Sequence, residues 1–499
     1  MNPGWDYRLW TDEDLLNLVR EHYPELEELY LSYPRGIQRA DLGRYLILDH
    51  CGGVYADLDT ECLSPLDSIA DEARVILAEE PIEHRYHSEP LGLDRLIFNG
   101  VMASPKGHPF WQHVITMLVR CRNGGAYVLE TTGPLALTGA VESYSEPEAL
   151  ALHSCHLFNP LTSTGRESTA PRHGPFSSQR ICNHYWQGSW FSRTKRNRRK
   201  RFKRALRKVR YHLSRGAFLS RHDIESQIDL SSLHRPIAPT DRNVAVLIPV
   251  RDGAPFLDRC LELLHGLDFP KAQLKIVFCE GDSVDGSAEK LRSVVQSLRG
   301  TYRDIIFTQY QTGAHLDRTR RWLPKFQRER RSNLARVRNH LIAKGLTNDD
   351  HWALWLDVDV CDYAPDILNR LLARNRKVVT PDCVLEWGGP SYDLNAFNDS
   401  AEIRDHRYYK YVRNGLYIPP ADHDRRRHLH DLRFLDKVPL TSVGGTMLLV
   451  HASVHRAGVH FPDVPYDDLL ETEGFGRICR DFGVQPFGLP NVQIKHVRS

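Results

Sequence analysis

The sequence predicts two α/β domains joined by a basic linker. The chain has 499 residues, too many for one hydrophobic core and suited to two domains of roughly 200 to 250 residues. Two apolar strands, within residues 52–59 and 352–360, each run into an Asp-x-Asp triplet. A strand, a helix and a second strand over residues 243–279 indicate the start of a parallel α/β sheet. The expected N-terminal domain, linker and C-terminal domain are residues 1–192, 193–240 and 241–499.

Each Asp-x-Asp triplet places two carboxylates on one side of the chain. Asp57 and Asp59 end the first strand, and Asp357 and Asp359 end the second. Because side chains alternate along a strand, the two aspartates of each triplet leave it on the same side. Two carboxylates in that position favour a bound cation, and their recurrence suggests two copies of one chemistry.

Two other interpretations of the triplets fail on neighbouring residues. An aspartyl-phosphate phosphatase needs Thr or Val at the fifth position, where this chain has Glu61 and Cys361. A calcium loop needs further oxygen ligands at alternate positions and a glutamate at the twelfth, which neither copy supplies. A metal–diphosphate site is the interpretation that remains.

The residues before the first triplet predict two helices and a turn. Thr11, with Asp14 three residues later, is typical of a capped helix start. Residues 39–48 have apolar positions at helical spacing, and Asp41 and Arg44 lie three apart on one face of that helix. In isolation this pair would be a surface ion pair, but a glycine turn leads directly from it into the Asp57 strand.

The N-terminal half resembles the glycosyltransferases with a DXD-containing sugar-binding region. That family includes the fungal initiating α-1,6-mannosyltransferases, and its motif is similar to the core of the clostridial glucosylating toxins. The resemblance rests on A-D-x-x-R and G-G-x-Y-x-D-x-D motifs and covers residues 1 to about 190. Further matching segments are residues 99–104, 132–134 and 184–190.

This resemblance implies that Asp57 and Asp59 are catalytic residues that hold a divalent ion on a nucleotide diphosphate. It also implies donor-binding residues, of which Ser189 and Trp190 would close over the site: Asp41, Arg44, Tyr55, Asn99, Ser189 and Trp190. Family members begin with a strand that helps to bind the nucleotide, and Met1 stands where that strand has already ended. We therefore expect a weakened wall around the nucleotide base in this half.

The linker contains a dense basic run. Twelve of the eighteen residues 193–210 are Lys or Arg, and none is acidic. The run fits a solvated linker, or a basic amphipathic helix over residues 193–215 that contacts an anionic membrane surface. No recognition motif accompanies the charge, so no nucleic acid partner is expected.

The C-terminal half lacks the glycine-rich motifs of other nucleotide sites. Neither a G-x-G-x-x-G sequence nor a Walker loop is present. Ligands of open α/β sheets bind beyond the carboxyl ends of the strands, which is where Asp282 is expected. The arginine-rich residues 328–339 precede the second triplet, and guanidinium groups pair with phosphate in a forked geometry.

A second resemblance, over some 250 residues, is to the fungal Golgi mannan-polymerase α-1,6-mannosyltransferase subunits. It rests on seven ordered segments: 249–252, 280–285, 335–339, 356–359, 443–448, 471–474 and 488–496. The family uses GDP-mannose and manganese, so the resemblance implies a metal site of Asp357, Asp359 and His496. Arg338 is then expected to be catalytic, with donor contacts from Pro249, Arg251, Asp282 and Asn339.

The two halves together predict a bifunctional, metal-dependent glycosyltransferase with two GT-A-like, Rossmann-like nucleotide-sugar-binding domains. Both resembled families retain the anomeric configuration, and a glycan or glycolipid is the expected acceptor. Carboxylate and histidine ligands favour Mn²⁺, with Mg²⁺ as the alternative. The alternative function is a single C-terminal mannosyltransferase whose N-terminal half is a non-catalytic sugar-binding or positioning module.

The sequence also bears on the compartment. No apolar stretch is long enough for a membrane span, and no secretory signal is recognisable. Ten cysteines occur without a C-x-x-C pair or a disulfide-rich cluster, and we expect them to be reduced. The expected location is the cytoplasm, with peripheral contact at the inner face of the membrane.

Overall fold

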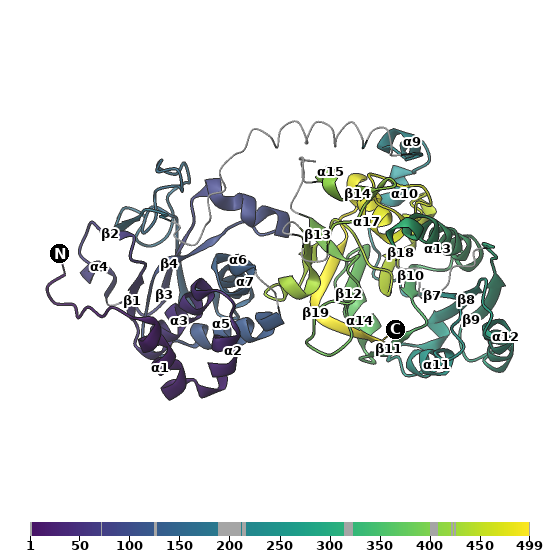
Figure 1. Ribbon diagram of the computed structural model, residues 1–499, viewed down its shortest axis with the longest axis horizontal. Coiled ribbons are helices and arrows are strands. Elements are labelled where there is room, and N and C mark those ends of the chain that lie inside the picture. The colour runs from purple at the N-terminus through teal and green to yellow at the C-terminus, as the bar shows by residue number, and fades with distance from the viewer. Residues whose placement is uncertain are drawn as a thin grey trace. The chain divides into compact units, whose positions relative to one another are not determined.

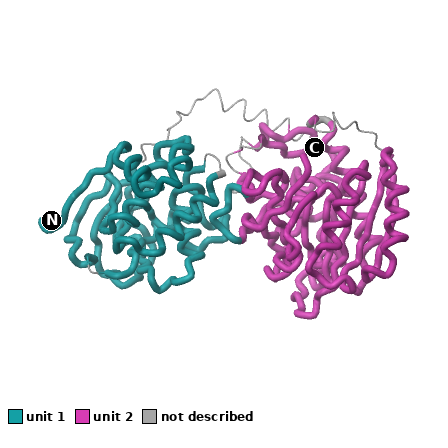
Figure 2. The backbone as a smooth tube through the Cα atoms, turned by 90° about the horizontal axis from the view of Figure 1, so that it is seen from below, with its two compact units in different colours: residues 1–195, 430–436 teal, residues 196–429, 437–499 magenta. Residues whose placement is uncertain are grey.

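The computed structural model describes residues 2–70, 72–123, 127–187, 211, 216–313, 323–399, 408–420, 423 and 426–498 (Figure 1). The basic run and the Ser189–Trp190 segment lie outside these residues. The described chain forms two compact units (Figure 2). Unit 1 comprises residues 1–195 and 430–436, and unit 2 comprises residues 196–429 and 437–499.

Unit 1 is a mixed α/β unit whose four-stranded sheet has the order β1-β4-β3-β5. The strands are β1 (Gly53–Ala56), β2 (Thr60–Cys62), β3 (Val75–Glu79), β4 (Ile97–Ser104), β5 (Leu150–His153) and β6 (Cys182–His184). The helices are α1 (Asp12–His22), α2 (Glu27–Ser32), α3 (Gly36–His50), α4 (Asp67–Ala70), α5 (Pro109–Arg120), α6 (Val128–Thr131) and α7 (Pro134–Ser143). The predicted cap is confirmed, because Thr11 Oγ accepts from the Asp14 amide while the Asp14 carboxylate accepts from the Thr11 amide.

Unit 2 is built around a larger sheet with the order β11-β19-β12-β18-β10-β7-β8-β9. These strands are β7 (Val244–Val250), β8 (Leu274–Glu280), β9 (Asp304–Gln309), β10 (Trp352–Leu356), β11 (Val360–Tyr363), β12 (Val378–Val384), β18 (Met447–His451) and β19 (Phe487–His496). Short strands are β13 (Phe397–Asp399), β14 (Val412–Arg413), β15 (Leu416–Tyr417), β16 (Arg426–His428) and β17 (Val438–Pro439).

Helices cover both faces of the unit 2 sheet. They are α9 (Arg221–Glu225), α10 (Leu230–Leu233), α11 (Leu257–His265), α12 (Ser287–Ser297), α13 (Pro324–Gly345), α14 (Ile367–Leu372), α15 (Tyr408–Tyr411), α16 (Ala452–Arg456) and α17 (Glu471–Asp481). The core side chains of α11, α12 and α14 pack on the face that carries Val244, Val246 and Ile248. The end of α13 packs on the opposite face, where Gly345 approaches Leu247 and Val277. The predicted strand, helix and strand of this half are confirmed as β7, α11 and β8.

The two sheets share a four-strand unit. In unit 1, β1 pairs antiparallel with β4, β4 antiparallel with β3, and β3 parallel with β5. In unit 2, β10, β18, β12 and β19 repeat this order with the same directions. The strand before each Asp-x-Asp triplet, β1 or β10, therefore occupies the same place in both sheets.

The units differ on the outer side of that strand. In unit 2, β10 pairs in parallel with β7, which is followed by β8 and β9. Among the described residues of unit 1, β1 has no such neighbour and is an edge strand. The middle residue of the triplet shows the consequence, because Val358 is 7% exposed while Leu58 is 85% exposed.

A buried cluster of charged side chains lies just before the start of β10. The Asp350 carboxylate has no exposed surface and pairs with Lys275 and Arg303. Although burial opposes the shift, hydrogen bonds from Lys275 and the Thr347 amide lower the pKa of Asp350 below 3.8. The charged carboxylate therefore compensates the buried Lys275 ammonium across the neutral pH range.

We expect Asp350→Asn to destabilise unit 2 by about 3–5 kcal/mol, because it leaves the buried Lys275 without its main counter-charge. Hydrogen exchange of the β7 and β10 peptides in increasing urea measures this loss. Because the folded pKa is depressed, the contribution of Asp350 should be complete above about pH 4 and be lost as the pH falls through the folded pKa.

Asp366→Asn is the matched control, since Asp366 pairs with Arg370 on the surface. It should change the stability by less than about 1 kcal/mol. Equal effects of the two substitutions would contradict the role of the buried pair.

Candidate active sites

The first site forms where β1 ends and β2 begins. Asp57 and Asp59 lie in the turn between these strands, and β2 pairs with β6 so that Thr60 faces His184. His184 Nε2 lies 2.9 Å from Asp59 Oδ1 and 3.8 Å from Asp57 Oδ2. One ligand atom from each of the three residues lies within 4.8 Å of the others, so they can surround one divalent cation.

His184 was not predicted as a ligand from the sequence, although it lies in a segment that carries the family resemblance. The prediction of His496 as a metal ligand of the C-terminal half could have suggested a matching histidine in the N-terminal half. Only the pairing of β2 with β6 shows that His184 holds the equivalent position.

A buried polar network supports the first aspartate. Arg44 Nη1 lies 3.3 Å from Asp57 Oδ1, and the Tyr55 hydroxyl donates to the same oxygen at 2.9 Å. The Arg44 guanidinium also pairs with Asp41 at 3.1 Å and donates to the Asn99 carbonyl at 2.7 Å. The structure thus brings together all the predicted donor-site residues of this half that it describes.

Asp41 is engaged from several sides. Its carboxylate accepts from the Asn99 amide at 3.0 Å and from the Thr132 hydroxyl at 2.9 Å. Burial raises the pKa of Asp41 to about 6, and the Arg44 charge opposes that shift. Asp41 therefore fixes Arg44 and Asn99 in addition to any contact with a sugar.

The second site repeats this arrangement after β10. Asp357 and Asp359 lie in the turn before β11, and β11 pairs with β19 so that Val360 faces His496. His496 Nε2 lies 3.0 Å from Asp359 Oδ1. His496 Nδ1 lies 2.7 Å from the Val497 carbonyl, which can only accept, so Nδ1 carries a proton. In the neutral ring, Nε2 therefore has a lone pair for a metal.

Arg338 holds the first aspartate of this site as Arg44 does in unit 1. Its Nη2 lies 3.2 Å from Asp357 Oδ1, and the side chain is 1% exposed. Burial raises the pKa of Asp357 to about 7, with Arg338 opposing the shift and Asp359 adding to it. A cation at the triplet would favour the charged carboxylates.

Glu471 is a site residue that the sequence did not single out. Its carboxylate accepts from Arg338 Nε at 2.8 Å and is 4% exposed. Glu471 has φ +55°, a left-handed conformation that costs a non-glycine residue about 1 kcal/mol or more. The sequence pointed to Glu471 only through the segment 471–474 of the family resemblance. The contact of this segment with Arg338 on α13 is seen only in the folded structure.

The other predicted residues of this half lie at the ends of β7 and β8 and on α13. Pro249 and Arg251 are at the end of β7, and Asp282 follows β8, so all three lie at the carboxyl ends of adjacent parallel strands. The Asp282 carboxylate accepts from the Thr312 and Gly313 amides and so fixes the turn after β9. Asn339 bonds the backbone of Phe461 through both its oxygen and its nitrogen, which is a structural role.

Ser189 and Trp190 lie outside the described residues. The segment before them already reaches the first site, because the Gln187 amide donates to Asp59 Oδ2 at 2.9 Å.

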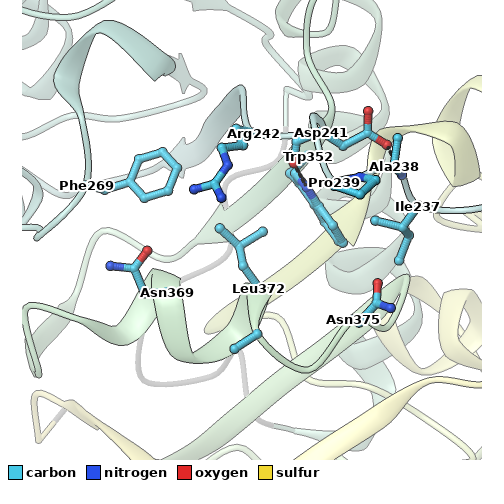
Figure 3. A pocket seen from close by; sticks show the side chains of 11 residues that line it. Ile237, Ala238, Pro239, Asp241, Arg242, Phe269, Trp352, Asn369, Leu372 and Asn375 are labelled. Atoms are coloured by element: carbon cyan, nitrogen blue, oxygen red, sulfur yellow. Dashed lines mark hydrogen bonds between the residues drawn. The ribbon is translucent and has the colours of Figure 1, made fainter.

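A separate cavity of about 410 Å³ lies at the start of β10, at the opposite end of this strand from Asp357 (Figure 3). In it the Arg242 side chain points between the rings of Phe269 and Trp352. The lining residues are Ile237, Ala238, Pro239, Asp241, Arg242, Phe269, Trp352, Asn369, Leu372, Ala373 and Asn375.

Two protein-family models match the chain. The family described as Anp1 matches residues 226–465, and the family described as glycosyltransferase sugar-binding region containing DXD motif matches residues 1–76. The expected resemblances of both halves are therefore confirmed. These matches, together with relatives named as mannosyltransferases, identify the chain as a glycosyltransferase.

Similar proteins include the mannan polymerase complex subunit mnn9 of Schizosaccharomyces pombe, 27% identical over 51% of this chain and 79% of that protein. The inositol phosphoceramide mannosyltransferase 1 of the same organism is 39% identical to this chain. The matched region covers 22% of this chain and 31% of that relative. A mannosyltransferase of Pyrobaculum calidifontis in complex with GDP-Man and Mn²⁺ has a TM-score of 0.30 at 16% identity, over 54% of this chain and 61% of that one.

The two histidines should make metal binding respond differently to pH. Burial lowers the pKa of His184, whereas the hydrogen bond and charge of Asp359 raise the pKa of His496 against the effect of burial. A histidine must be neutral to bind a metal. As the pH is lowered, Mn²⁺ binding by unit 2 should begin to weaken while the pH is still above 6.5, because His496 becomes protonated there. Mn²⁺ binding by unit 1 should weaken only once the pH is below 6.5.

Calorimetric Mn²⁺ titrations isolate each site. The variant Asp357→Asn with Asp359→Asn reports on unit 1, and Asp57→Asn with Asp59→Asn reports on unit 2. Loss of both sites at one pH, or of the unit 1 site first, would contradict the assignment of the histidines.

Proposed function

We propose that the chain contains two divalent-cation-dependent glycosyltransferase sites, one in each of two GT-A-like domains joined by the basic linker. The observation that carries this proposal is the repeated geometry. In each unit a buried arginine contacts the first aspartate of the triplet, at 3.3 Å and 3.2 Å. A histidine paired across the following strand contacts the second aspartate, at 2.9 Å and 3.0 Å.

The residues of each site have distinct tasks in this function. Asp57, Asp59 and His184, or Asp357, Asp359 and His496, would hold the cation, and the histidine ligand favours Mn²⁺ over Mg²⁺. A bound cation supplies positive charge that stabilises the departing nucleoside diphosphate. Arg44 and Arg338 keep the first aspartate of each triplet in place, and Asp41 and Glu471 hold these arginines in turn.

Mannose is the proposed sugar and GDP-mannose the proposed donor of unit 2, because relatives with the printed names mannan polymerase subunit and mannosyltransferase match the chain. We propose transfer with retention to a glycan or glycolipid acceptor. No helix among the described residues is long and apolar enough to cross a bilayer. We also propose that the protein is cytoplasmic and that residues 193–215 make peripheral contact with an anionic membrane surface.

A second candidate function is that unit 1 only binds or positions a sugar. The observation that supports this second candidate is that β1 is an edge strand among the described residues of unit 1. In unit 2 the equivalent strand is covered by β7, whose end packs with Gly253 around Val358. In the described part of unit 1 nothing equivalent covers Leu58. A donor bound there would have fewer contacts to its base and be held more weakly.

We expect Asp57→Asn with Asp59→Asn to leave mannose transfer by unit 2 within about threefold of wild type, a change below about 1 kcal/mol in activation free energy. The reason is that each site has its own complete set of ligands. The measurement is transfer from radiolabelled GDP-mannose with Mn²⁺, and chelation by EDTA should abolish it reversibly.

The matched variant Asp357→Asn with Asp359→Asn should abolish that activity. Asp94→Asn, at an exposed position of unit 1, controls for the loss of an acidic group. Collapse of mannose transfer in the unit 1 variant, with the fold intact by circular dichroism, would mean that the halves form one coupled site.

A further inference from the structure

Two cysteines face each other across the ladder that builds the first site. In the pairing of β2 with β6, Cys62 lies directly opposite Cys182, two positions from the pair Thr60 and His184. Cys62 is partly exposed, and Cys182 is 4% exposed. Among the strand pairings of the described residues, no other two cysteines are opposite each other.

The hydrogen-bond pattern shows which kind of pair this is. The Tyr185 amide donates to the Asp59 carbonyl at 3.0 Å, and the Leu63 amide donates to the Ile181 carbonyl at 2.8 Å. The hydrogen-bonded pairs of this antiparallel ladder are therefore at the odd positions of β2. Cys62 and Cys182 form a non-hydrogen-bonded pair, in which Cα atoms are about 4.5 Å apart and side chains approach most closely. That separation falls within the range of about 4.4–6.8 Å seen for disulfides.

The present contacts of the two thiols are weak. The Cys62 thiol donates to the Ser64 carbonyl at 3.2 Å, and the Cys182 thiol donates to the Phe158 carbonyl at 3.3 Å. Thiols are weak donors, so rotation of both side chains toward each other sacrifices little.

The pair is also placed to affect the metal ligands. Side chains two apart on a strand share a face, so Cys182 and His184 lie on the same face of β6. The same ladder holds His184 against Asp59. In unit 2 the register following Val360 and His496 pairs Asp362 with Lys495, so this feature belongs to unit 1 alone among the described strands.

We propose that Cys62 and Cys182 form a reversible disulfide that fixes the β2–β6 ladder and strengthens metal binding at Asp57, Asp59 and His184. The oxidant is a small-molecule disulfide such as oxidised glutathione. The Cys62 sulfur attacks it, forming a mixed disulfide and releasing one thiol, and the Cys182 sulfur then displaces the second thiol. Two protein thiols are oxidised and one disulfide is reduced to two thiols, with their two protons transferred to the released sulfurs. The metal-binding consequence rests on the function proposed for unit 1.

The full chain with Asp357→Asn and Asp359→Asn, incubated with oxidised glutathione, tests the linkage. Non-reducing peptide mapping should show Cys62 joined to Cys182, and dithiothreitol should reverse it. Cys62→Ser should abolish the linkage, while Cys51→Ser, at an exposed thiol of the same unit, should leave it. Stable glutathione on Cys62, or its linkage to any other cysteine, would overturn the proposed disulfide.

Mn²⁺ titration of the same chain tests the consequence. We expect at least threefold tighter binding after oxidation and no such change in the Cys62→Ser variant. Equal affinity of the reduced and linked forms would overturn the effect on the metal site. Absence of Mn²⁺ binding in both forms would count against the function of unit 1, and the peptide map would still decide the disulfide.

Discussion

The pairing of a short strand after each Asp-x-Asp triplet with a strand that ends in histidine is the constraint on which both sites depend. A triplet alone gives two carboxylates in a turn, which solvent can screen. The β2–β6 and β11–β19 pairings bring a buried imidazole within 3.0 Å of the second carboxylate in each unit. Backbone hydrogen bonds thus set the distance between Asp59 and His184, which are 125 positions apart in the sequence, and between Asp359 and His496, which are 137 positions apart.

The buried arginines are the second shared element, and their energetics explain why each has several partners. A guanidinium removed from water is costly unless its charge and its donors are satisfied. Arg44 has Asp41, Asp57 and the Asn99 carbonyl, and Arg338 has Glu471, Asp357 and the Gly445 carbonyl. The two units use different acidic residues for the same task, one from the same helix and one from a distant segment.

The units diverge where a nucleotide base would be expected to lie. Three parallel strands extend the unit 2 sheet beyond β10 and bury Val358, whereas β1 is an edge in the described part of unit 1 and Leu58 is exposed. In the function proposed for this chain, the carboxylates and histidine at the end of β1 or β10 would hold the cation, and the strands beyond β10 would lie beside the base. The described part of unit 1 keeps the first of these features without the second.

The sequence by itself determined the α/β class, the two Asp-x-Asp turns, the capped first helix and the βαβ start of the second half, because these depend on local periodicity and on neighbouring residues. It also placed Arg44 with Asp57 and His496 with the second triplet, through family resemblance. Only the tertiary structure decided that His184 is the matching ligand, that Glu471 holds Arg338, and that Asn339 binds the Phe461 backbone. These contacts join residues more than a hundred positions apart, and strand register and helix packing, which arise only when the whole core forms, determine which of them meet.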